Sequence, residues 1–129
     1  MRKSHLGFTL VEIMIVVVII ALLAAIAIPN MLRSRQQAHE AAAQANLKLI
    51  ANALENYAAV NSVYPTGTTA LMGVTPPYLS TDYFTGVHGG YTFTNSLTDY
   101  TYLISAFPTA TTPGTASFTV STGGILTKY

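Results

Sequence analysis

The stretch LGFTLVEIMIVVVIIALLAAIAIP, residues 6–29, decides the fold of this chain. From Ile13 to Ile28 it contains no polar side chain, and Pro29 ends the apolar run. Residues 8–28 are 21 residues. As a helix rising about 1.5 Å per residue they would span roughly 30 Å, the thickness of the hydrocarbon core of a bilayer. Only a helix satisfies its own backbone there, so the stretch predicts a single transmembrane helix.

Two residues of this stretch exceed the needs of a plain membrane anchor. Glu12 places a carboxylate near the end of the membrane helix, where it costs a few kcal/mol or more unless it is paired. Pro29 lacks a backbone donor and predicts a kink or a melted turn in the helix. Two basic side chains flank each end, within residues 2–3 and 33–35, so positive-inside counting leaves the orientation of the helix tied.

The composition agrees with a membrane-inserted chain rather than a soluble one. Half of the 129 residues are hydrophobic and only 9% are charged, against about 25% charged in a typical soluble domain. The length suits one domain plus a tail. The formal net charge is +1, with no basic patch, so the sequence predicts no direct binding of nucleic acid. There is no cysteine, and therefore no disulfide can hold the fold.

Residues 30–61 continue the helical pattern, because they are rich in good helix formers and contain no glycine or proline. From Leu47 to Tyr57, apolar side chains recur at spacings of three and four, which predicts one face packed on a head. The stripe consists of Leu47, Ile50, Leu54 and Tyr57. Small side chains lie at Ala38, Ala41, Ala42, Ala45 and Ala53, and they suit either the core or a close contact with another subunit.

The remaining residues predict a small head built mostly of strands, which makes the fold class α+β. Residues 62–90 lose the helical periodicity and read as loop, with a short helical turn at 68–72. Residues 91–129 alternate in polarity and predict about four antiparallel strands, with a turn at 95–99 and a hairpin turn at 121–124. One face of this sheet is expected to pack on the apolar stripe of the long helix.

The sequence contains no recognisable catalytic or metal-binding constellation. His5, His39 and His88 are far apart along the chain, and no pair of them has metal-ligand spacing. Asp82 and Asp99 are the only acids of the head, too few for a calcium site. We therefore expect a protein that is not an enzyme and that binds no metal or cofactor.

The segment Gly7-Phe8-Thr9-Leu10-Val11-Glu12, followed by the apolar run and Pro29, resembles the class III signal and N-terminal helix of the type IV pilin superfamily. That superfamily includes type IV pilins and the pseudopilins of type II secretion. The resemblance covers residues 1 to about 60 and implies the pilin fold. It implies a leader at 1–7, a transmembrane and filament-core helix at 8–29, an amphipathic helix at 30–61, and a head with a variable loop and sheet at 62–129.

Carried onto this chain, the resemblance implies processing by a prepilin peptidase of the inner membrane. The peptidase would cut between Gly7 and Phe8 and methylate the amine of Phe8. The single-pass subunit would wait in membrane lipid with its leader in the cytoplasm and its head outside. A cytoplasmic ATPase and a membrane platform protein would then extrude it into a homopolymeric filament, either a pilus on the cell surface or a periplasmic pseudopilus.

The same resemblance implies that Glu12 helps recruit the subunit and sets its register. The physics is consistent, because a carboxylate in low dielectric is tolerable when a cation lies close, and cleavage would create such a cation at Phe8. We expect a structural subunit of a type IV pilus. The alternatives are the major pseudopilin of type II secretion, a DNA-uptake pseudopilus, and a singly anchored binding module that forms no polymer.

Two absences bear on the choice between a pilus and a secretion filament. Many type IV pilins close a C-terminal disulfide loop, which a chain without cysteine cannot form. Major pseudopilins usually carry an aspartate-containing calcium loop near the C-terminus, and residues 117–129 contain no acid. Each absence weakens one of the two interpretations.

Overall fold

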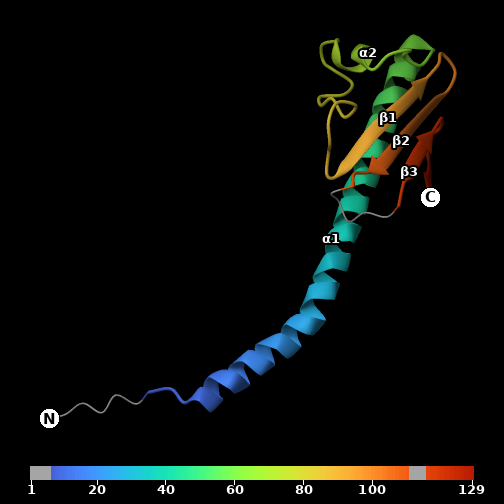
Figure 1. Ribbon diagram of the computed structural model, residues 1–129. Helices are drawn as coiled ribbons and strands as arrows, with labels where there is room; N and C mark the ends of the chain where they lie inside the picture. The colour runs from blue at the N-terminus through green and yellow to red at the C-terminus, as the bar shows by residue number, and fades with distance from the viewer. Residues whose placement is uncertain (1–6, 111–115) are drawn as a thin grey trace. The chain divides into compact units, whose positions relative to one another are not determined.

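The computed structural model describes residues 7–110 and 116–129. A long helix, α1, is followed by a one-turn helix, α2, and four strands (Figure 1). Their bounds are α1 Leu10–Asn61, α2 Thr69–Met72, β1 Tyr91–Leu97, β2 Tyr102–Pro108, β3 Phe118–Ser121 and β4 Ile125–Lys128. The predicted α+β class, with a long helix packed on a four-stranded antiparallel sheet, is confirmed.

Helix α1 runs without interruption for 52 residues. Pro29 lies inside it and the residues on both sides of the proline stay helical, so the melted turn considered from the sequence is not present. A kink at Pro29 stays a prediction. The helix ends where Ser62 takes a left-handed conformation (φ 63°) and donates its N–H to the carbonyl of Ala58 at 2.8 Å. This closing turn satisfies one of the carbonyls that a helix end leaves open.

The chain divides into two compact units, residues 1–34 and Arg35–Tyr129. In the first unit, the described residues form the beginning of α1 and the short segment before it. The second unit contains the rest of α1 together with the loops and the sheet, so the head has a helix as part of its own body.

The sheet has the order β1-β2-β3-β4, and every neighbouring pair is antiparallel. Strand β1 continues to Leu97, which pairs with Tyr102. The predicted turn at 95–99 was therefore placed too early. The turn spans residues 98–101 because Thr98 and Thr101 bond to each other across it. The hairpin between β3 and β4 turns as the sequence predicts, with the left-handed φ values falling on Gly123 and Gly124.

The core lies between α1 and one face of the sheet. Figure 1 shows the sheet alongside the C-terminal half of α1. Leu47, Ile50 and Leu54 of the predicted stripe are fully buried, and Tyr57 packs against them half-buried. The sheet contributes alternate residues, as expected for a sheet with one face on the core. These are Tyr91 and Phe93 in β1, Tyr102, Ile104 and Ala106 in β2, and Phe118 and Val120 in β3.

Candidate functional site

The apolar part of α1 is exposed along its whole length. Among the residues that the structure describes, its large hydrophobic side chains from Leu10 to Leu32 are at least half exposed, and α1 is long and apolar enough to cross a membrane. Leu23, for example, is 63% exposed. An apolar surface of this extent is not stable in water, so it needs lipid or other protein chains around it.

Glu12 closes the N-terminus of this helix together with Thr9. The Glu12 carboxylate accepts the Thr9 backbone N–H and the Thr9 hydroxyl, both at 3.0 Å. The Glu12 N–H donates in turn to the Thr9 hydroxyl oxygen at 3.2 Å. This reciprocal arrangement is a capping box, which satisfies donors that a helix start otherwise leaves unpaired. Glu12 is therefore partnered within its own chain, although not by the cation that the sequence analysis expects.

Sequence reasoning missed the capping box, although its signal is visible in the sequence. A Ser or Thr followed three residues later by Glu, just before an apolar run, is the pattern of a helix start, and Thr9 and Glu12 have that spacing. The expected cation, the amine of Phe8, exists only after a cut between residues 7 and 8. The pairing of Glu12 with that amine stays a prediction.

Gly7 and Phe8 precede the helix and belong to no helix or strand. Both are exposed, and the Phe8 side chain is 84% exposed. A Cβ added at Gly7 would meet no atom within 4 Å. Packing against the described residues therefore does not require glycine at position 7. A requirement for glycine there would come from a partner such as a peptidase. The bond between the two residues therefore lies in an exposed segment outside the helix, as cleavage by a peptidase would need.

The alanines of α1 separate into two groups. Ala53 is buried at 3% exposure and belongs to the core, as does Ala43. Four of the alanines singled out from the sequence are exposed instead: Ala38, Ala41, Ala42 and Ala45. The core interpretation therefore holds for Ala53 alone, and Ala42 has a separate role because it lies beneath Gly89 of the loop before β1.

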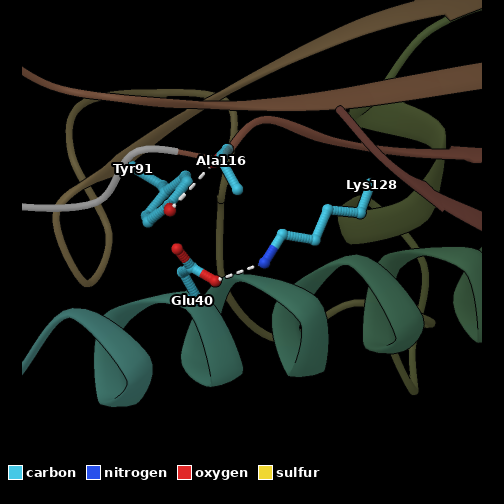
Figure 2. A network of polar contacts seen from close by, with 4 residues as sticks. All are labelled: Glu40, Tyr91, Ala116 and Lys128. Carbon is cyan, nitrogen blue, oxygen red and sulfur yellow. Dashed lines mark hydrogen bonds and ion pairs between the residues drawn. The ribbon is translucent and has the colours of Figure 1, made fainter. Parts of the chain in front are cut away.

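Two further carboxylates tie the head to α1. Glu40 accepts Lys128 of β4 at 2.9 Å, and beside it the hydroxyl of Tyr91 donates to the carbonyl of Ala116 at 3.0 Å (Figure 2). Burial raises the pKa of Tyr91, and the charge of Glu40 adds to the rise. Lys128 is more than half exposed, so this ion pair is a surface contact.

Glu55 makes the larger of the two ties. Its carboxylate accepts the hydroxyls of Tyr64 at 3.0 Å and Tyr102 at 2.9 Å, and the backbone N–H of Gly123 at 3.0 Å. The Tyr102 oxygen in turn accepts the N–H of Gly124. Burial, followed by the bond to Glu55, raises the pKa of both tyrosines. One carboxylate thus joins α1 to the segment after it, to β2 and to the β3–β4 turn.

His39 and His88 both bond to backbone carbonyls of the loop before β1. His39 Nδ1 lies 2.7 Å from the carbonyl oxygen of Gly89, and the neighbouring His88 bonds through Nε2 to the carbonyl of Thr85. A carbonyl oxygen only accepts, so each ring nitrogen is a donor. Within residues 7–110 and 116–129, no three histidine or acidic side chains are arranged to hold a metal ion.

Residues 2–28 match the family model described as the prokaryotic N-terminal methylation motif. The chain is 46% identical over 66 residues to type II secretion system core protein G of Vibrio cholerae, covering 51% of this chain and 44% of the relative. It is 44% identical over 64 residues to the core protein G of Pseudomonas aeruginosa, covering 50% and 45%. The type IV wide pilus major component PilA4 of Thermus thermophilus is 40% identical over 74 residues, covering 57% and 56%. The chain spans about half the length of the curated relatives it matches.

Proposed function

The N-terminal segment of this chain is that of the type IV pilin and pseudopilin superfamily, and from this we propose that the protein is the structural subunit of a type II secretion pseudopilus. The exposed apolar helix of residues 10–32 carries the proposal, because it needs lipid before assembly and other copies afterwards. Heterologous contacts between identical subunits do not close, and they generate a fibre. The proposed role is structural rather than catalytic.

The relatives decide which filament is proposed. The sequence alone favours a type IV pilus, but core protein G of Vibrio cholerae and Pseudomonas aeruginosa is more similar to this chain than PilA4 is. We therefore propose a secretion pseudopilin, which the sequence alone supports only as an alternative to the type IV pilin. The pilus remains the second candidate, supported by the 40% identity to PilA4 over more than half of this chain.

The proposed maturation begins at the exposed bond between Gly7 and Phe8. Hydrolysis of that bond would release the leader and create the amine of Phe8, which a methyl donor would then alkylate. Before the cut, Thr9 is the partner of Glu12 among the residues that the structure describes. After it, the new ammonium group would lie four residues from the carboxylate, or reach it from a neighbouring copy. A pairing in low dielectric would fix register, because a shift by one turn leaves both charges unpaired.

The proposed location follows from the same steps. The leader would face the cytoplasm and the helix of residues 10–28 would cross the inner membrane once, which places the head outside the cytoplasm. The partners would be the prepilin peptidase, membrane lipid, an assembly ATPase with its platform protein, and further copies of the chain. The Thr-rich head carries few charges and its sequence has no basic patch, so we expect no direct contact with nucleic acid.

Two measurements test the proposal. Mass spectrometry of the mature protein is expected to find a methylated peptide beginning at Phe8, and an N-terminus at Met1 would overturn it in favour of a singly anchored binding module. Deletion of the gene is expected to abolish secretion of exoproteins while pili persist. Loss of pili with intact secretion would instead select the pilus, and loss of DNA uptake alone would select an uptake pseudopilus.

A further inference from the structure

Nearly all side-chain carboxylates of this chain are engaged within it. The sequence holds five acidic residues. Four of them bond to groups of their own chain: Glu12 to Thr9, Glu40 to Lys128, Glu55 to two tyrosines and Gly123, and Asp82 to Phe84 and Thr85. Across the described ranges 7–110 and 116–129, the carboxylate of Asp99 alone contacts no donor, and Asp99 is exposed.

Asp99 stands at the tip of a firmly held turn between β1 and β2. Four hydrogen bonds join Thr98 and Thr101 across the turn, among them N–H to carbonyl at 2.9 Å and N–H to hydroxyl at 3.0 Å. From the side of α1, the Tyr64 N–H donates to the Asp99 carbonyl at 2.9 Å. Tyr100, the other residue of the tip, is 79% exposed. The backbone is fixed on two sides while both tip side chains stay open to solvent.

A carboxylate next to an exposed phenol ring on a fixed turn suits a guanidinium group. The planar fork of arginine binds a carboxylate through two parallel N–H bonds and also stacks on an aromatic face, which a lysine ammonium does less well. Because the turn is already ordered, little conformational entropy remains to be lost on binding. The chemistry of the tip therefore favours an arginine as its partner.

Arg33 and Arg35 are the arginines in the described part of the chain, and both are exposed and without a polar contact there. At about 100° per residue, the two side chains leave α1 roughly 200° apart, so one neighbour cannot meet both. Arg35 belongs to the same compact unit as Asp99, whereas Arg33 belongs to the other. Arg35 lies three residues beyond Leu32, the last large side chain of the exposed apolar run, where the proposed contact between copies would end.

Arg35 of the same chain cannot reach Asp99. From Arg35 to the end of α1 at Asn61 the helix rises about 39 Å. Asp99 is fixed to Tyr64, just beyond that end, so the two charges lie at opposite ends of the head. An ion pair requires a separation of about 4 Å. The contact can therefore form only between two copies, one displaced along the helix direction by roughly the length of the head.

We propose that Asp99 and Tyr100 of one subunit receive Arg35 of a second copy and that this contact fixes the axial stagger of the filament. The inference rests on the proposed function, because it needs a homopolymer. The contact is heterologous: each subunit gives Arg35 to one neighbour and Asp99 to another, so the contact repeats without closing. An exposed pair is weak by itself, but it recurs at every subunit and penalises wrong registers.

Charge reversal tests the pairing in full-length protein expressed with its assembly machinery. Filaments sheared from cells are measured against subunits left in the membrane. Asp99→Arg and Arg35→Asp are each expected to lower the sheared fraction about tenfold or more, the factor that 1.4 kcal/mol represents. The double variant Asp99→Arg with Arg35→Asp is expected to restore it to within about twofold. Processing of the N-terminus confirms that every variant reaches the membrane.

Two matched controls keep the result specific. Asp82→Arg with Arg35→Asp moves the same charges on an exposed loop acid and is expected to remain defective. Asp99→Arg with Arg33→Glu is expected to remain defective as well, and rescue by that pair would overturn the assignment to Arg35. Failure of the double reversal of residues 99 and 35, while wild type assembles, overturns the inference alone. If processed wild type forms no filament at all, the proposed function fails first.

A direct contact test uses the absence of cysteine from the chain. Asp99→Cys and Arg35→Cys are produced as two separate variants in the same cells and treated with a short bifunctional thiol reagent. A cross-linked dimer of the two variants is expected, and either variant alone gives none. Asp99→Cys with Lys48→Cys is the control, and a dimer there in place of the first would overturn the assignment.

Discussion

The two halves of helix α1 differ in how far the rest of the chain covers their apolar side chains. Leu23 and Leu47 lie in the same α1, yet Leu23 is 63% exposed and Leu47 is fully buried. The second half finds its cover in the strands that its own chain supplies. The first half is more apolar, with no polar side chain from Ile13 to Ile28, and it finds no such cover within the described residues. The head therefore has a hydrophobic core of its own, whereas the N-terminal unit needs lipid or other protein chains to cover its apolar side chains.

The carboxylates of the two units differ in how far along the sequence their hydrogen-bond partners lie. Glu12 is satisfied by Thr9, three residues away, so the N-terminal unit solves its hydrogen bonding locally. Glu55 depends on Gly123, 68 residues away, and on tyrosines from two other segments. Within the described residues, the N-terminal unit thus lacks hydrophobic cover, while its carboxylate is bonded by a residue close in sequence. This combination suits the proposed passage of an intact helix from lipid into a filament.

The largest effect is expected from Glu12→Gln. The amide keeps the size of the side chain and one acceptor, but it removes the charge that would pair with the Phe8 amine. Cleavage is expected to proceed and the sheared filament fraction to fall to background, because register is lost rather than helix structure. Immunoblots of membrane and sheared fractions measure both steps.

Thr9→Val is the matched control for this variant, because it removes the capping hydroxyl while keeping the carboxylate. Its filament yield is expected to fall far less than that of Glu12→Gln. Equal losses in the two variants would mean that the capping box, and not the charge, is what assembly requires.

Two leucine-to-alanine variants, one in each half of α1, test whether the two halves contribute differently to the stability of the head. Leu47→Ala is expected to destabilise the head by about 2–5 kcal/mol, through lost burial and the cavity left behind. Leu23→Ala removes the same atoms from an exposed site, so the unfolding of the head is expected to change by less than about 0.5 kcal/mol. Denaturant unfolding of the full chain in detergent micelles measures both.

A head destabilised equally by the two variants would contradict the division into separate units. The reverse asymmetry is expected in filament yield, where Leu23→Ala weakens contacts between copies. Leu47→Ala would reduce that yield only through lower levels of folded protein.

The fold was predictable because its signals are local and periodic. The apolar run from Ile13 to Ile28 and the stripe at Leu47, Ile50 and Leu54 fix both halves of α1. The Gly123-Gly124 turn marks the last hairpin. The end of β1 was missed because Asn95 and Ser96 read as a turn, whereas pairing with β2 carries the strand to Leu97. Tertiary pairing outweighs turn propensity there.

The candidate site was predictable in part, for the same reason. A compact sequence motif predicts Gly7, Phe8 and Glu12 as site residues, and their roles stay predictions. The spacing of Thr9 and Glu12 also signals the capping box that the structure shows. The role of Glu55 had no such signal. Its partners become neighbours only when β2 and the β3–β4 turn close on α1. The sequence gives no signal for Asp99 either. Its carboxylate is distinguished only by comparison with the other four, which have donors among the described residues.

A smaller effect is expected from alkaline pH, and it is confined to the head. The folded-state pKa values of Tyr64, Tyr91 and Tyr102 lie above the usual 10.0, chiefly because of burial. Their stabilising contribution is thus fully present below pH 10 and is lost as pH rises through the folded values. Phenolate absorbance of the native chain is expected to lag behind that of the unfolded chain, with the melting temperature falling above pH 10.

Glu55→Gln tests the cause of part of this lag. Removing the charge beside Tyr64 and Tyr102 is expected to bring their titration closer to that of the unfolded chain, while Tyr91 stays unchanged. An unchanged native titration curve would mean that burial alone is responsible.

The smallest effect is expected from Lys128→Ala, at the other tie between sheet and helix. Lys128 is 58% exposed, so its ion pair with Glu40 is screened by solvent, and we expect a coupling of about 0.2–1 kcal/mol in a double-mutant cycle with Glu40→Ala. The coupling is expected to shrink as salt rises from 0.01 to about 0.1 M, where the screening length falls to roughly 10 Å. A coupling above about 2 kcal/mol that resists salt would show that β4 is held to α1 by charge. The head would then depend on a charged contact, as the N-terminal unit depends on Glu12. The two units would then differ only in how far their apolar side chains are covered.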